Sequence, residues 1–152
     1  MANIEKSIDV EVPVRTVYNQ WTQFEEFPRF MEGVTAVTQL DDRRLRWQAK
    51  IGGKEKDWTA EISEQKPDER VAWKSTSGAK NAGVVTFHRL ADRRTRVMLQ
   101  IDYDPEGAAE NVGDAVGMVH GRVDGDLRRF KDFVESRPRE TGAWRGEIPA
   151  KP

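Results

Sequence analysis

Residues 104–135 read DPEGAAENVGDAVGMVHGRVDGDLRRFKDFVE, and this stretch decides the fold. Its larger apolar residues recur every three or four positions, which is the spacing of one face of an α-helix. Asp104 suits the N-cap of such a helix, with Pro105 at its first position and Glu106 in its first turn. We therefore predict one long helix near the C-terminus, whose apolar stripe needs a wide apolar partner. The stripe consists of Val112, Val116, Val119, Val123, Leu127, Phe130 and Val134.

The residues before that helix alternate between apolar and polar side chains, as half-buried antiparallel strands do. Gly52 and Gly53 stand between two such runs and indicate a two-residue hairpin turn. Residues 14–21 and 24–31 have helical spacing instead, and Pro28 interrupts the second segment. The order is one strand, two short helices, more strands and the long helix. It predicts an α+β fold in which a curved antiparallel sheet of about seven strands packs on the long helix.

The composition limits the class of protein. The 152 residues suit one domain, and the absence of cysteine excludes disulfides and thiolate metal sites. The 25 Lys and Arg residues balance 26 Asp and Glu residues, which argues against nucleic acid as a partner. No apolar run suits a transmembrane helix, and the first residues lack the apolar core of a signal peptide. We expect a cytoplasmic protein without a metal or another cofactor.

The alternation of the strands also predicts which side chains face the covered side of the sheet. This face is apolar, and it has no carboxylate, lysine or histidine among the side chains assigned to it. Because burying an unpaired charge is costly, we expect Arg46, Lys50 and Lys74 to point away from the long helix. The predicted face consists of Leu45, Trp47, Ala49, Ile51, Trp58, Ala60, Ile62, Val71, Trp73, Ser75, Val97, Leu99, Ile101 and Tyr103, joined by Val85 and Phe87.

Residues 12–34 read VPVRTVYNQWTQFEEFPRFMEGV, and this segment resembles the opening of START-like polyketide cyclase/dehydrase proteins, the SRPBCC superfamily. The matching features are the Pro, the Val-Tyr pair, the Trp and the Phe-Pro-x-Phe-Met run. Residues 83–87 (GVVTF) and 95–97 (TRV) agree with it. The resemblance implies a helix-grip fold with a hydrophobic tunnel. It places the mouth near residues 52–53, 77–81 and 105–107, and it implies no catalytic residue.

We expect non-covalent binding of a hydrophobic small molecule, such as a lipid, a polyketide or an isoprenoid-like compound, in an internal cavity. Three tryptophans on neighbouring strands of one sheet face favour a pocket, although Trp also serves in ordinary cores. The candidate ligand-binding residues are Trp47, Trp58, Trp73, Phe87, Tyr103, Val116 and Val119.

Two alternatives remain open. The first is a polyketide cyclase or dehydratase that transfers protons through Tyr103 and either His88 or His120, the only histidines of the chain. His88 has the parity of outward-facing residues, and His120 sits at the edge of the helical stripe, so either can equally be a structural histidine. The second alternative is a protein-interaction module with a vestigial cavity.

The back of the long helix and the C-terminal residues form the last feature. Gly113, Gly117, Gly121 and Gly125 recur every four residues, and each costs up to about 1 kcal/mol relative to Ala in a helix. Either the helix tolerates this weakness, or the smooth face packs closely against a C-terminal arm or against a second subunit in a homodimer. We predict a ligand-binding domain over residues 1–136 and an extended arm over 137–152. The arm is expected to lie on or beside the long helix, anchored by Trp144, with Ile148 as its other large apolar side chain.

Overall fold

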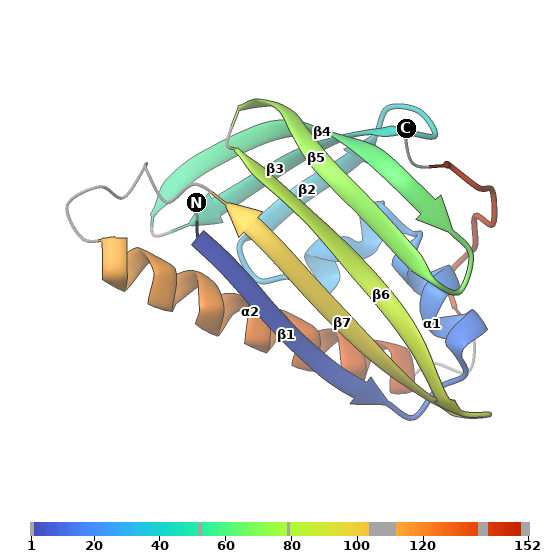
Figure 1. The fold of residues 1–152 in the computed structure, drawn as a ribbon. Coiled ribbons are helices and arrows are strands. Elements are labelled where there is room, and N and C mark those ends of the chain that lie inside the picture. Colours follow the sequence, from blue (N-terminus) through green and yellow to red (C-terminus); the bar gives the residue numbers. More distant parts are fainter. Residues whose placement is uncertain (1, 52, 79, 104–111, 137–139, 150–152) are drawn as a thin grey trace.

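The computed structural model describes residues 2–51, 53–78, 80–103, 112–136 and 140–149, without the side chains of residues 2, 51 and 112–120. It contains one seven-stranded antiparallel sheet in the order β1-β7-β6-β5-β4-β3-β2. Figure 1 shows this sheet curling around one long helix. The strands are β1 (Ala2–Val10), β2 (Val34–Gln39), β3 (Arg44–Ile51), β4 (Lys54–Lys66), β5 (Arg70–Gly78), β6 (Asn81–Ala91) and β7 (Arg94–Tyr103); the helices are α1 (Val14–Trp21), the 3-10 helix η1 (Phe24–Arg29) and α2 (Val112–Glu135).

This architecture confirms the predicted α+β helix-grip fold, with two short helices after the first strand. The second short helix is a 3-10 helix that contains Pro28. The predicted N-cap at Asp104 lies outside the described residues, because α2 is described from Val112 onward.

The core lies between the covered face of the sheet and the apolar stripe of α2. Figure 1 shows that α1 and η1 close the same layer at one end. The ring of Phe130 on α2 lies 5.1 Å from that of Trp21 and 5.1 Å from that of Phe30, so the helix is held by aromatic contacts. The stripe is confirmed over the second half of α2, where the buried residues are Val123, Leu127, Phe130 and Val134.

The two ends of the sheet differ in what surrounds them. The tip end is formed by the end of β7, the β3–β4 hairpin and the residues joining β5 to β6. The arm end is formed by the opposite strand termini. Lys131 donates to the carbonyl of Asp9, and Glu135 accepts from the backbone N–H of Glu11, so the last turns of α2 lie at the arm end. The helix therefore begins near the tip end (Figure 1).

Residues 140–149 form an arm that packs on α1 and on β4. The side chain of Asn19 donates to Glu140 over 2.8 Å, and the backbone N–H of Trp144 donates to the Thr22 hydroxyl. Ile148 pairs with Gln65 of β4 through two backbone hydrogen bonds of 2.8 Å. The predicted position beside the long helix is therefore wrong. Ile148 is the anchor of the arm: its backbone bridge to β4 holds it on the sheet, and it is only 3% exposed. Trp144, the predicted anchor, is half-buried.

The predicted covered face is correct in register. Every described member of it is buried or half-buried, and Arg46, Lys50 and Lys74 are exposed, as predicted. The prediction of a face free of ionised side chains is wrong at its margins. Lys6 lies opposite Leu99 and Lys56 opposite Ala49, so both lysines share the covered face, and both are half-buried. One is on an edge strand and the other is near a hairpin turn, where a lysine stem can lead its ammonium group to water.

The two glycines of this face with described surroundings differ. Around Gly121, apart from the adjoining helix backbone, no described atom lies within 4 Å of the place where a Cβ atom would stand, and at Gly125 the guanidinium group of Arg129 covers that place. The surroundings of Gly113 and Gly117 lie outside the described residues. Because the arm packs on α1, it does not explain Gly121, and a homodimer interface on this face stays a prediction.

Candidate functional site

On β5 and β7, burial along the covered face decreases from the arm end to the tip end. On β7, Leu99 is buried whereas Tyr103 is half-buried, and on β5, Val71 is buried whereas Trp73 is half-buried. The sheet is thus fully packed at one end and leaves large apolar side chains partly uncovered at the other. The half-buried members toward the tip end are Trp47, Trp58, Trp73, Ser75, Ile101 and Tyr103.

Four of these side chains, Trp47, Trp58, Trp73 and Tyr103, are here called the aromatic surface. Trp47 and Trp58 are direct cross-strand partners on β3 and β4, and their rings stack at 5.7 Å and 8°. Phe27 of η1 packs against Trp47 at 5.5 Å. The indole of Trp47 is therefore fixed by neighbours, and its N–H is buried without a hydrogen-bond partner among the described residues.

Trp73 lies flat over the neighbouring strand. A Cβ atom at Gly83, its partner on β6, would collide with the six-membered ring of Trp73. The indole N–H donates to the side-chain oxygen of Asn81 over 3.2 Å, and the backbone N–H of Asn81 donates to the Ser75 hydroxyl. A glycine beneath the ring and a hydrogen bond at its edge thus place an indole face along the floor of the sheet.

Tyr103 ends β7 at the same end of the sheet, opposite Asn81 of β6. Its hydroxyl is buried and has no hydrogen-bond partner among the residues that the structure describes. Burial raises the pKa of this hydroxyl above its usual value of 10, so the group is protonated at neutral pH and can donate or accept a hydrogen bond.

The structure separates two of the remaining predicted site residues, Phe87 and His88, from the aromatic surface. Phe87 is buried toward the arm end, where its ring contacts Tyr18 at 5.4 Å and Trp21 at 6.2 Å. His88 is exposed on the opposite face of the sheet, and its Nε2 lies 2.9 Å from the Thr86 hydroxyl. Val116, Val119 and His120 belong to α2, and their side chains lie outside the described residues.

Sequence reasoning missed a group of charged side chains on α2 that bind the segment joining η1 to β2. Asp126 accepts from the backbone N–H of Glu32 over 3.0 Å, Arg122 donates to the Glu32 carbonyl, and Arg129 donates to the Phe30 carbonyl. The Asp126 side chain is 16% exposed, and burial raises the pKa of its carboxyl from 3.8 to about 6. These groups are engaged with backbone, so they position α2 rather than offer a catalytic pair. Helical spacing of 122, 126 and 129 is the one signal that could have suggested it.

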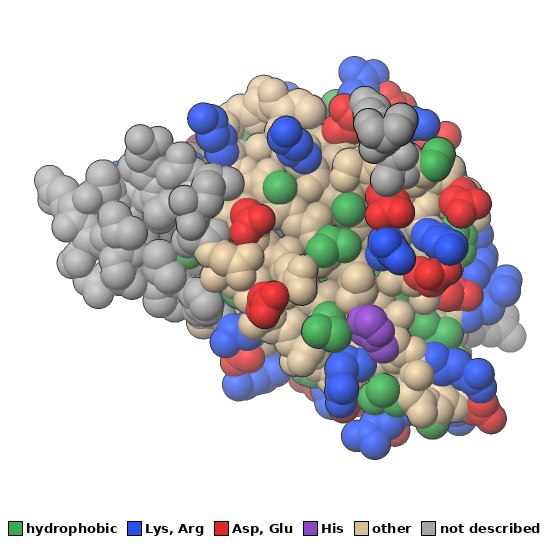
Figure 2. All heavy atoms as spheres, viewed as in Figure 1, with side chains coloured by type: hydrophobic (Ala, Val, Ile, Leu, Met, Phe, Trp, Pro, Cys, Tyr) green, Lys and Arg blue, Asp and Glu red, His purple; other side chains and the backbone are tan. Residues whose placement is uncertain are grey.

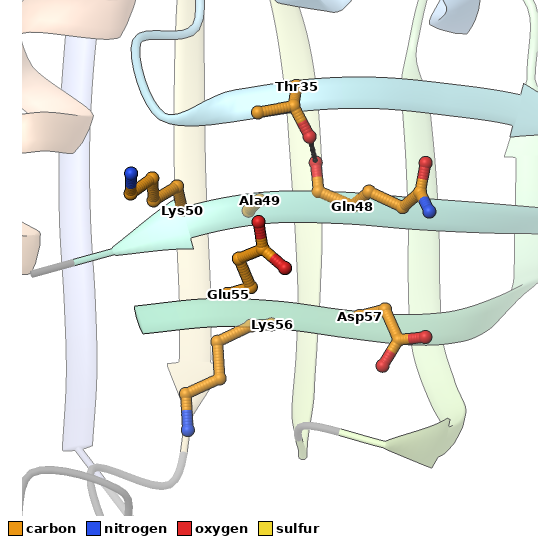
Figure 3. Close-up of a pocket in the computed structure, with 7 residues that line it drawn as sticks. All are labelled: Thr35, Gln48, Ala49, Lys50, Glu55, Lys56 and Asp57. Atoms are coloured by element: carbon orange, nitrogen blue, oxygen red, sulfur yellow. Dashed lines mark hydrogen bonds between the residues drawn. The ribbon is translucent and has the colours of Figure 1, made fainter. Parts of the chain in front are cut away.

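The outer face of the sheet differs in chemistry from the aromatic surface. Basic and acidic side chains are interspersed over the outer face of the sheet (Figure 2), without a field of one sign. A hollow of about 420 Å³ over β2, β3 and β4 is polar (Figure 3). Both charge signs meet in it, since its lining residues are Thr35, Gln48, Ala49, Lys50, Glu55, Lys56 and Asp57.

Comparison with known proteins identifies the family. The family model described as polyketide cyclase/dehydrase and lipid transport matches residues 10–132. The chain therefore belongs to this family, which confirms the resemblance carried by residues 12–34. An uncharacterized 17.2 kDa protein from the melC2-rnhH intergenic region of Streptomyces lincolnensis is 54% identical over 149 residues, covering 97% of this chain and 99% of that protein.

Solved structures share the fold. The Zhui aromatase/cyclase from Streptomyces sp. R1128 superimposes with a TM-score of 0.77 at 16% identity, covering 94% of this chain and 99% of that chain. A START superfamily protein from Mycobacterium smegmatis gives 0.65 at 13% identity, covering 84% and 97%. At these identities the likeness extends to the fold alone. Among the described residues, no helix combines the length and the apolar character needed to cross a membrane.

Proposed function

We propose that this protein binds a hydrophobic small molecule non-covalently between the tip end of the covered face and the first half of α2. The observation that carries the proposal is the aromatic surface. It consists of large side chains that stand half-buried on the side of the sheet that elsewhere forms the core. Covering such a surface removes apolar area from water, which is favourable by roughly 25 cal/mol per Å².

The local structure keeps this surface available. The stacked pair of Trp47 and Trp58 and the flat ring of Trp73 are each held by neighbours in the protein. Rings that are already fixed lose little conformational freedom when a ligand covers them, which favours binding. The family supports the same conclusion, since its description includes lipid transport.

The enzymatic alternative is a polyketide cyclase or dehydratase. The support for it is the fold that this chain shares with the Zhui aromatase/cyclase. Tyr103 faces the proposed site, but its raised pKa makes it a donor rather than a base at neutral pH. His88 lies on the other face of the sheet. Tyr103 is the one titratable side chain of the aromatic surface, so proton abstraction would need a group outside that surface, such as Lys56 or His120, and we place binding first.

Native mass spectrometry of the purified protein, combined with titration of the fluorescent probe N-phenyl-1-naphthylamine, tests the proposal. We expect a co-purifying molecule or micromolar probe binding, and at least a tenfold loss of probe affinity in Trp58→Ala. The matched control is Leu40→Ala, which removes an apolar side chain that is 51% exposed and lies away from the aromatic surface. Equal affinity in both variants, or no binding in the native protein, would reject the proposed function.

A further inference from the structure

We infer that the bound molecule is elongated and carries a hydrogen-bond acceptor toward each end, one for the Tyr103 hydroxyl and one for the Trp47 indole N–H. This inference rests on the proposed function and specifies its ligand. Its starting point is that both polar atoms are buried and have no hydrogen-bond partner in the described part of the chain. In folded proteins the large majority of buried polar side-chain atoms have one, so two orphans on one binding face call for an explanation.

Among the described side chains, two other buried atoms also lack a partner, Gln65 Oε1 and Asp68 Oδ1, but on the aromatic surface the unpartnered atoms are those of Trp47 and Tyr103. By contrast, the indole N–H of Trp73 donates to the side-chain oxygen of Asn81 within the protein. On the aromatic surface, the indole N–H of Trp73 therefore has a hydrogen-bond acceptor, whereas that of Trp47 has none among the described residues. A purely structural role would favour internal partners for both, as the Trp73–Asn81 pair demonstrates.

The two orphan groups cannot satisfy each other. Trp47 is on β3 and Tyr103 is on β7, and β4, β5 and β6 lie between them. At about 4.8 Å between neighbouring strands, four steps span roughly 19 Å along the curved sheet. One molecule that reaches both groups must therefore be long, and it must cross the strands over the ring of Trp73.

The chemistry of the two groups fixes the chemistry of the ligand ends. An indole N–H only donates, so the ligand must present an acceptor to Trp47. The Tyr103 hydroxyl can donate or accept, and an acceptor such as the oxygen of a ketone, ester or ether satisfies both groups. Between them the apolar rings require a hydrocarbon or aromatic middle.

Competition against N-phenyl-1-naphthylamine measures this pattern directly. Dimethyl dodecanedioate has an ester at each end, and methyl tetradecanoate has the same chain length with one ester. We expect the diester to bind the native protein about fivefold more tightly, as one net hydrogen bond predicts, and diesters with longer middles to locate the best length. Tyr103→Phe and Trp47→Phe should each abolish the preference, whereas Leu40→Ala, the control away from the aromatic surface, should retain it.

A second readout needs no substitution. The side-chain ¹H–¹⁵N resonance of Trp47 should move downfield with the diester, whereas the Trp73 resonance should keep the position set by Asn81. If the probe binds but no diester of the series is preferred and the Trp47 resonance is unmoved, the inference is wrong while the proposed function stands. If neither the probe nor any ester binds, the proposed function itself is wrong.

Discussion

The indole ring of Trp73 on β5 occupies the space that a side chain would need at Gly83, its partner on β6. We predict that Gly83→Ala displaces the ring and breaks its hydrogen bond to Asn81. Overpacking of this kind costs about 1–3 kcal/mol, which lowers the Tm of a chain of this size by several degrees. Thermal unfolding and probe titration measure both effects. An unchanged Tm together with unchanged probe affinity would contradict the assigned role of Gly83.

Gly121 gives the opposite prediction for the same substitution. Apart from the adjoining helix backbone, no described atom lies within 4 Å of its Cβ position, and it lies inside α2, where Ala is favoured over Gly by about 1 kcal/mol. Gly121→Ala should therefore raise the Tm of a monomer by a few degrees. Light scattering on both proteins tests the homodimer in the same samples. A lower Tm with loss of a dimer would show that the glycine face is an interface.

The sequence predicted features that depend on neighbours along the chain. Alternation within each strand was enough to assign Leu45, Trp47 and Trp58 to the covered face, because side-chain direction repeats every two residues. The alternation did not predict the burial of Gln65. A register shift between Ile62 and Glu64 turns Gln65 to the buried side, where its amide donates to the Tyr18 hydroxyl.

Other features depend on segments that are distant in the sequence. Asp126 meets a backbone N–H that is 94 residues away, and Arg145 meets Asn19 and Asp68 across the fold. The spacing of apolar residues along the sequence cannot indicate such long-range pairs. The prediction that the arm lies on or beside α2 is therefore wrong, although Trp144 and Ile148 correctly indicate that the arm has apolar contacts.

The stability of the protein should depend on pH through Asp126. Burial raises the pKa of this carboxyl from 3.8 to about 6, so the folded state holds the proton more tightly than the unfolded state. Its stabilising contribution is complete below pH 3.8 and is lost as the pH rises through about 6, at up to about 1.4 kcal/mol per pH unit.

Urea unfolding between pH 3.5 and 7 would measure this contribution. Relative to the native protein, Asp126→Asn should gain stability as the pH rises, since the amide cannot ionise. Asp132→Asn, at an exposed position on the same helix, is the control and should leave the profile unchanged. Parallel profiles for the native protein and Asp126→Asn would exclude a raised pKa at this site.

The arm should contribute directly to stability, because its contacts are those of an integrated element. Ile148 is buried and bridges to Gln65, and removing buried methyl groups from Ile costs about 2–5 kcal/mol. Ile148→Ala should therefore lower the Tm strongly, and truncation after residue 139 should lower it further by removing the hydrogen bonds to Asn19 and Thr22. Glu147→Ala, at an exposed neighbour, and deletion of residues 150–152 serve as controls. If truncation after residue 139 leaves the Tm within a degree of the native value, the arm does not stabilise the domain.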